Sequence, residues 1–211
     1  MSPKITVTTH PLAQHLVSNL RDARTAPAQF RNFSDLLTVI LALEATHDLA
    51  LQTISVDTPL ETMDGNYLAS GIVVVPILRA GLGMLQPILN LFPDVSVGYI
   101  GLARDHTTAM ASAYYEKLPN LRESPNRPVL IVDPMLATGG SACQAIDAVK
   151  SAGGIDIRLV CVVAAPEGVE AVNASHPDVP IFSAALDREL NDVKYILPGL
   201  GDFGDRLFGT L

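Results

Sequence analysis

The residues best suited to chemistry follow a short apolar segment in the second half of the chain. Asp133 comes directly after the apolar run Val129–Val132, and the sequence then reads Thr138-Gly139-Gly140-Ser141 before an amphipathic run from 142 to 152. Glycines let a ligand approach the backbone closely, and the free N–H groups at the start of a helix attract phosphate. A carboxylate would repel a bare phosphate, but it accepts hydrogen bonds from sugar hydroxyls. The pattern therefore favours a site for a phosphorylated sugar over an ordinary strand-to-helix turn with Ser141 as the N-cap.

A second loop of similar design carries an arginine. Arg79-Ala80-Gly81-Leu82-Gly83 follows the apolar run Gly71–Ile77 and precedes an expected helix that ends at about Leu91. In open α/β sheets, ligands bind beyond the carboxyl ends of the strands, so we expect both loops to face one cleft. Alone, Arg79 is typical of a surface ion-pair partner; beside a phosphate loop it becomes an anion ligand.

A third arginine, Arg104, opens the long polar stretch 104–126. A loop of that length inside a compact domain is usually functional or mobile, and a mobile arginine can arrive with the substrate and help to exclude water. His106 has no assigned role and is interpreted as a solvated loop histidine.

The tail contains a literal G-x-G-x-x-G at 199–204. It follows Pro198 near the end of the chain, with no room for the βαβ unit or the later acid of a dinucleotide site. We therefore reject that interpretation.

Alternating helices and strands must position these residues. The periodicity predicts an α/β protein with a parallel sheet and right-handed crossovers, in a single domain over 1–211 whose core spans about 70–185. The predicted helices are 10–24, 27–50, a helix after Gly83 that ends at about 91, 142–152 and 166–174; the predicted strands are 54–57, 71–77, 95–102, 129–132, 157–163 and 181–184; 63–66 is a predicted turn and 191–211 an irregular tail. The apolar faces of the first two helices fit packing on their own domain or on a second subunit.

Composition restricts the class of protein further. With 48% hydrophobic and 17% charged residues, the chain should be globular, and its net charge of −8 argues against a general affinity for nucleic acid or an anionic membrane. Cys143 and Cys161 lack metal-ligand spacing and are interpreted as reduced core residues. There is no signal pattern and no apolar run of the roughly 20 residues that a membrane helix needs, so we expect a cytoplasmic protein.

Asp133–Ser141 resembles the phosphoribosyl-pyrophosphate (PRPP) motif of the type I phosphoribosyltransferases. Pro134 stands where most members carry a second acid, which indicates the uracil phosphoribosyltransferase branch. The resemblance runs from His10-Pro11-Leu12 to Phe208-Gly209-Thr210 and is strongest over 74–83, 130–141, 164–168 and 195–210. It implies the type I phosphoribosyltransferase-like parallel sheet flanked by helices, with N-terminal helices and a small hood formed by the C-terminal segment.

The same resemblance implies roles for individual residues. Asp133, Arg79 and Arg104 would be catalytic. PRPP would contact Arg79, Arg104, Asp133, Pro134, Met135, Leu136, Ala137, Thr138, Gly139, Gly140, Ser141 and Asp202, and uracil would contact Ile196, Gly201, Asp202 and Phe203. A non-proline cis peptide is expected near Leu78-Arg79. Phe203 replaces the small residue that is more common in the family, so the pocket should differ there.

The implied reaction is uracil plus PRPP giving UMP plus diphosphate, in pyrimidine salvage. It implies Mg²⁺ held mainly by substrate and water rather than by a protein cage, GTP as a candidate effector, and a homodimer or larger homo-oligomer, with no nucleic-acid or membrane partner. Two other classes stay open: a regulatory RNA-binding protein on the same fold, and a transferase for another base such as a purine.

Overall fold

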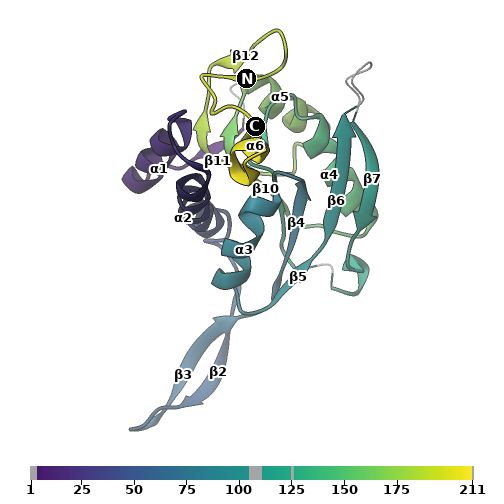
Figure 1. Cartoon of the computed structure of the whole chain (residues 1–211). Helices are drawn as coiled ribbons and strands as arrows, with labels where there is room; N and C mark the ends of the chain where they lie inside the picture. Colours follow the sequence, from purple (N-terminus) through teal and green to yellow (C-terminus); the bar gives the residue numbers. More distant parts are fainter. Residues whose placement is uncertain (1–3, 105–110, 125, 211) are drawn as a thin grey trace.

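The computed structural model describes residues 4–104, 111–124 and 126–210, and its centre is a mostly parallel sheet (Figure 1). The strand order is β1-β11-β10-β8-β4-β6-β7, with β5 paired to β4 and β9 to β10. Only β6 and β7 pair antiparallel within this sheet. The strands are β1 Thr6–Val7, β4 Ile72–Leu78, β5 Val95–Val97, β6 Tyr99–Arg104, β7 Ala111–Lys117, β8 Val129–Val132, β9 Met135–Leu136, β10 Ile157–Ala164 and β11 Ile181–Leu186. The predicted α/β parallel sheet is therefore confirmed.

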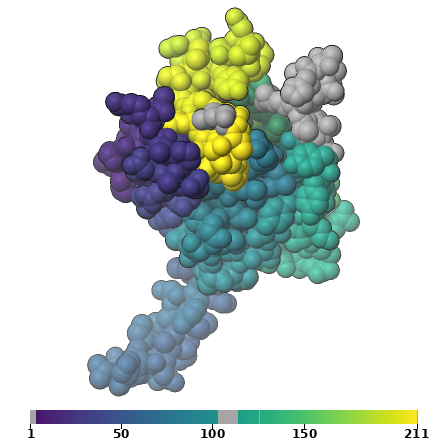
Figure 2. Space-filling view, viewed as in Figure 1, coloured from purple at the N-terminus to yellow at the C-terminus, as the bar shows by residue number. Residues whose placement is uncertain are grey.

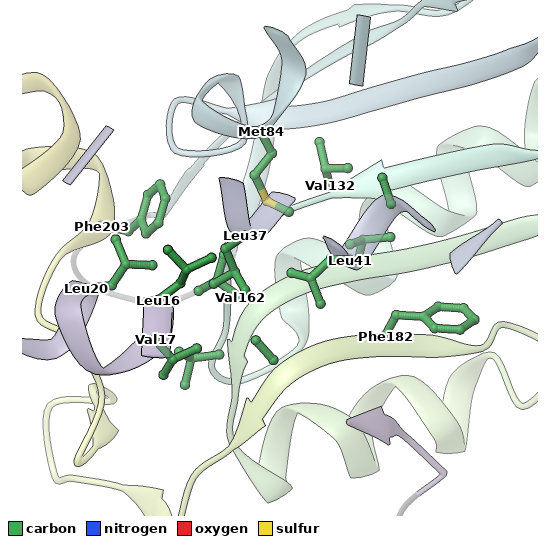
Figure 3. Packing of buried hydrophobic residues seen from close by; sticks show 14 of the residues in the cluster. Leu16, Val17, Leu20, Leu37, Leu41, Met84, Val132, Val162, Phe182 and Phe203 are labelled. Carbon is green, nitrogen blue, oxygen red and sulfur yellow. The ribbon is translucent and has the colours of Figure 1, made fainter. Parts of the chain in front are cut away.

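Helices cover both faces of this sheet, as its continuous apolar strands require. Alternate residues of β4 enter opposite layers: Val74 packs with the helices α1, α2, α3 and α6, and Val73 packs with α4 and α5. Figure 3 shows the first of these layers. The helices are α1 Pro11–Arg21, α2 Pro27–Ala45, α3 Leu82–Leu91, α4 Gly140–Ser151, α5 Pro166–Ser175 and α6 Phe203–Phe208, with a 3₁₀ turn at Leu121–Glu123. No helix in the described part of the chain is long and apolar enough to cross a membrane.

The first two helices are shorter than predicted. Proline occupies the first position of both α1 and α2, as is common. The α1 helix stops before Asp22, whose backbone is extended, and α2 ends at Ala45. Arg158, buried near the start of β10, binds that end of α2: its guanidinium donates to the Ala45 carbonyl (2.6 Å) and pairs with Asp48 and Asp156.

A two-stranded arm projects from the body (Figures 1 and 2). It consists of β2 Leu51–Asp57 and β3 Thr62–Leu68, paired antiparallel along their whole length. The predicted turn at 63–66 is wrong, because these residues lie inside β3 opposite β2. The real turn is 58–61, where the Thr58 hydroxyl accepts hydrogen bonds from the N–H groups of Leu60 (3.2 Å) and Glu61 (3.0 Å).

Three other expectations need correction. The stretch 104–126 is not wholly irregular, since β7 lies within it and pairs with β6. The tail is also more ordered than predicted: β13 Ile196–Leu197 pairs with β12 Glu189–Leu190, and α6 follows. The predicted strand 95–102 is interrupted at Gly98, where a Cβ would lie only 2.7 Å from Leu118.

Candidate functional site

The two glycine-containing loops emerge side by side at the carboxyl edge of the sheet. Strands β4 and β8 are parallel neighbours, with Pro76 opposite Val132. A Cβ on Gly81 would lie 2.5 Å from the Val132 carbonyl oxygen. The loop of residues 79–83, which we call the arginine loop, therefore packs tightly against the end of β8. Asp133 is the next residue along the chain. The two loops therefore leave the sheet side by side at one edge, as the shared-cleft prediction requires.

The arginine loop begins with a cis peptide bond between Leu78 and Arg79, as expected. The Arg79 side chain is 61% exposed, and its Nη2 lies 3.3 Å from Asp205 Oδ1 at the start of α6. An exposed pair at that distance stabilises the fold little. The guanidinium can therefore exchange this carboxylate for an anionic ligand at little cost.

The loop of residues 133–141, which we call the phosphate loop, contains a glycine that no other residue could replace without strain. Gly139 has φ +82° and precedes α4, and a Cβ there would lie 2.9 Å from the Gly168 carbonyl oxygen. Gly140 is exposed, and a Cβ there would meet only the Thr138 hydroxyl oxygen, at 3.8 Å, so a ligand can reach its backbone. Gly139, not Ser141, is the N-cap, and as a glycine it has no side-chain oxygen that could bond the first N–H groups of α4. These N–H groups can therefore serve an anion.

Asp133 is fixed by its backbone while its carboxylate stays partly accessible. Its N–H donates to the Val160 carbonyl (3.1 Å), and its Oδ1 lies 3.5 Å from the Met135 nitrogen. Its side chain is half-buried. Arg104 is the last residue of β6, the strand beside β4, so its backbone reaches the same edge of the sheet. His106 lies outside the described residues.

The C-terminal segment, which we call the hood (residues 187–205), forms the yellow-green and yellow top of the molecule, at the end away from the arm (Figure 2). It turns sharply through Gly199 (φ +60°) and Gly201 (φ +83°), with a cis bond at Leu197-Pro198. Asp202 then caps α6, its Oδ1 accepting from the Asp205 N–H (2.9 Å). Asp202 and Gly201 are exposed, so both can contact a ligand.

A cavity of about 310 Å³ connects the hood with both loops. Its walls include Ala80 from the arginine loop, and Met135 and Ala137 from the phosphate loop. All four residues predicted to contact uracil line it, together with Gly204 and the unpredicted Val193, Lys194 and Tyr195. The side chains of Asp133 and of the Gly139–Ser141 segment are not part of its wall, so the predicted PRPP residues extend the site beyond this cavity.

The Phe203 ring itself belongs to the core. It is 1% exposed and meets Phe30 edge-on, with ring centroids 5.1 Å apart, beside Leu20 and Leu16 (Figure 3). A Cβ on Gly83 would lie 3.2 Å from this ring, so the start of α3 packs directly against it. The larger residue thus anchors the hood to the helical layer.

Sequence reasoning missed an arginine that supports the hood from behind. Arg206, nine-tenths buried, donates to the carbonyls of Leu20, Leu200 (2.7 Å) and Asp22 (2.6 Å). It also lies 4.5 Å from the Phe30 ring centroid, and burial lowers its pKa. Two of its three partners, the carbonyls of Leu20 and Asp22, are more than 180 positions away in sequence, so no local pattern could have revealed this role.

Within the described residues, no group of three or more histidine, cysteine or acidic side chains could hold a metal ion. The cysteines are both free thiols. Burial raises the pKa of the Cys161 thiol to about 12, and burial also raises that of Cys143. Both thiols therefore stay protonated and unreactive near neutral pH.

Known proteins resemble the chain along nearly its whole length. The sequence model of the uracil phosphoribosyltransferase family matches residues 7–210. Uracil phosphoribosyltransferases of Staphylococcus epidermidis and Staphylococcus aureus are each 50% identical over 208 residues, covering 98% of this chain and 99% of theirs. A solved structure from Aquifex aeolicus is 38% identical, with a TM-score of 0.91 over 97% of both chains. An orotate phosphoribosyltransferase of Mycobacterium tuberculosis, 18% identical over 85% of this chain and 91% of its own, shares the fold with a TM-score of 0.50.

Proposed function

The chain belongs to the uracil phosphoribosyltransferase family, and from that premise we propose how its residues carry the reaction. That reaction transfers the phosphoribosyl group of PRPP to N1 of uracil, giving UMP and diphosphate in pyrimidine salvage. The observation that best supports the assignment of the site is the cavity bounded by the arginine loop, the phosphate loop and the hood. Each of these three segments can contact a different part of PRPP or uracil.

PRPP fits the two loops. The N–H groups at the start of α4, with Thr138 and Ser141, cradle the 5-phosphate. Asp133, held at the end of β8, accepts hydrogen bonds from the ribose hydroxyls. Arg79 binds the diphosphate in place of Asp205, and Arg104 joins it from β6. Pro134–Ala137 and Asp202 complete the PRPP contacts.

Mg²⁺ fits this arrangement as a partner of the substrate. It keeps several waters and usually takes one or two carboxylates in addition to substrate phosphates. The exposed Asp202 and half-buried Asp133 supply two such carboxylates at the edge of the sheet. When bound, Mg²⁺ would neutralise negative charge on the diphosphate.

Uracil fits the hood through backbone groups. Along one edge it presents acceptor, donor and acceptor, which rigid C=O and N–H groups near Ile196 and Gly201 can match. If a hood N–H faces position 4, the amino group of cytosine would meet a donor and leave it unpaired. The unpaired donor would make the binding free energy of cytosine about 1–3 kcal/mol less favourable than that of uracil.

The residues act by position and charge rather than as nucleophiles. The bond from C1 to diphosphate breaks as positive charge develops on the sugar. Uracil N1 forms the new bond to C1 from the hood side, and its proton leaves to the departing diphosphate or to water. Arg79 and Arg104 stabilise the leaving diphosphate. Asp133 holds the ribose in place between the diphosphate and uracil. Preorganised groups of this kind can supply much of a rate enhancement.

A panel of bases with labelled PRPP tests the proposed function. We expect labelled UMP with uracil and little product with cytosine or purines, and adding GTP to the same assay tests GTP as an effector. Product only with another base would contradict the uracil assignment. A salt-dependent RNA gel shift without any turnover would instead favour the regulatory class.

Replacing Arg79 with alanine should weaken binding of PRPP and diphosphate by about tenfold or more, because a charge-assisted bond to the diphosphate is lost. Uracil affinity should change little. The measurement is KM for each substrate together with inhibition by diphosphate. A matched control is Arg122→Ala, which removes another exposed arginine, bound to the Ser151 carbonyl at the end of α4 opposite the phosphate loop. Equal losses for all three ligands would indicate misfolding instead.

The arm supports a homodimer or larger homo-oligomer. Because paired strand residues share a face, Ile54, Val56, Met63 and Tyr67 lie on one face of the arm, while Thr53, Ser55, Asp64 and Asn66 lie on the other. Ile54, Met63 and Tyr67 are 39%, 50% and 49% exposed. An apolar face on a projecting hairpin suits a second copy of the chain.

Placing glutamate at both Ile54 and Met63 should therefore weaken self-association by about tenfold or more. Light scattering after size-exclusion chromatography over a dilution series measures it. Thr53→Glu, on the opposite face of the arm, is the matched control and should leave the mass unchanged. An unaltered assembly in the double variant would exclude the arm from the interface.

We also propose that residues 1–211 act as one domain and work in the cytoplasm, as the composition predicts.

A further inference from the structure

Arg21 and two residues of the hood, Asp187 and Gly199, form a closed ring of hydrogen bonds. Arg21, the last residue of α1, contacts Asp187 through both ends of its guanidinium, at 2.8 Å and 2.5 Å. The Asp187 carboxylate also accepts from the Gly199 N–H (2.8 Å), and Arg21 donates to the Gly199 carbonyl (2.7 Å). Both backbone groups of Gly199 are thus held by one ion pair.

The ion pair is well placed to fix geometry. The Asp187 side chain is 5% exposed and that of Arg21 is 24% exposed. A forked guanidinium–carboxylate contact has one preferred orientation, unlike the point charge of a lysine. Asp187 is itself anchored, because its N–H donates to the Ala164 carbonyl at 2.8 Å. The ring therefore ties the hood to the end of the central strand β10 and to α1.

Gly199 is the point at which the hood changes direction. Its φ is +60°, and a Cβ there would lie 2.2 Å from the Ile196 carbonyl oxygen. It stands three residues after Ile196 and two before Gly201. Because peptide units are planar and rigid, a rotation at Gly199 would move the backbone groups on both sides of it.

We propose that Arg21 and Asp187 are positioning residues for uracil. They hold the Gly199 peptide units so that the backbone groups near Ile196 and Gly201 face the base in one arrangement. The inference rests on the proposed function, in which the hood binds uracil. Neither side chain lines the cavity, so they act through the backbone. Displacement of such a group by about 1 Å can cost a hundredfold in rate, and a preorganised site binds more tightly than a flexible one.

The test compares uracil and PRPP in the same variants. Asp187→Asn keeps the size of the side chain but breaks the ion pair, and Arg21→Met removes the donor to Gly199. We expect KM for uracil to rise about tenfold or more in both, while Kd for PRPP, measured by calorimetry without uracil, stays within about twofold. Arg21→Lys, which keeps the charge, should recover part of the uracil affinity.

Arg158→Met is the control for a merely structural effect. Arg158 makes a comparable set of bonds at the opposite end of the sheet, to Ala45, Asp48 and Asp156. The Arg158→Met variant should have a lower Tm than the wild type and an unchanged KM for uracil. Should Asp187→Asn fail to fold, the more exposed Arg21 variants decide the question.

The outcomes separate the two proposals. Wild-type protein that makes no UMP from uracil would overturn the proposed function itself. Active wild type with folded Arg21 or Asp187 variants of unchanged uracil KM would overturn only the positioning role. So would a rise in PRPP Kd equal to the rise in uracil KM, because a general loss of structure would then explain both.

Discussion

Asparagine in place of Asp133 should lower kcat/KM by about a hundredfold or more while the fold is retained. The substitution preserves the size of the side chain, and the backbone bond from Asp133 to Val160 remains. The carboxylate, however, accepts hydrogen bonds from hydroxyls and opposes the positive charge that develops on the sugar. An amide offers one acceptor and no charge, so the loss should fall on the transition state more than on the ground state.

Steady-state kinetics with both substrates measure this effect, and thermal unfolding verifies the fold. Asp94→Asn is the matched control, because Asp94 is an exposed carboxylate, 70% accessible, paired with Arg127 near the opposite edge of the sheet. It should retain the activity of the wild type. Turnover close to that of the wild type in Asp133→Asn would contradict the role assigned to this carboxylate.

The sheet and the two loops could be predicted because their signals are local. Four consecutive apolar residues at Val129–Val132 leave little alternative to a buried strand, and such strands align in parallel when helices connect them. Both loops follow such a strand directly, so their shared edge follows from topology alone. The cis peptide at Leu78-Arg79 came from family resemblance, not from the residues themselves.

The arm was misread because two local signals compete. Ile54 and Val56 alternate with polar residues, as a strand should, but Met63-Asp64-Gly65-Asn66 has the composition of a turn. The structure resolves the conflict through Pro59 and the Thr58 hydroxyl, which make the turn five residues earlier. Gly65 then packs against Val56 across the pair, where a Cβ would lie only 2.7 Å away.

The support of the hood could not be predicted for a different reason. Arg21 and Asp187 are separated by 166 positions, and Arg206 reaches the Leu20 carbonyl across 186. Each arginine lies in an amphipathic segment where a solvated charge is the ordinary interpretation. Only the closed fold brings them to backbone groups of the hood, so tertiary structure determines their role.

The second large effect concerns the hood backbone. Gly201→Val should raise KM for uracil by about tenfold to a hundredfold, because φ is +83° and a β-branched residue there costs roughly 1–3 kcal/mol. The strain should act on the site and not on packing, since a Cβ at this position would meet only Arg206 Cδ, at 3.6 Å. The backbone would relax away from the geometry that matches the base.

Gly209→Val separates this effect from strain alone. Gly209 has a similar φ of +70°, and a Cβ there would meet only Pro27 at 3.9 Å, but it lies at the end of α6, outside the walls of the cavity. Both variants should lower Tm, and only Gly201→Val should lose uracil affinity, because only Gly201 faces the cavity. Equal uracil KM values in the two variants would remove the hood as the base site, since backbone strain of the same kind would then be without consequence for the base.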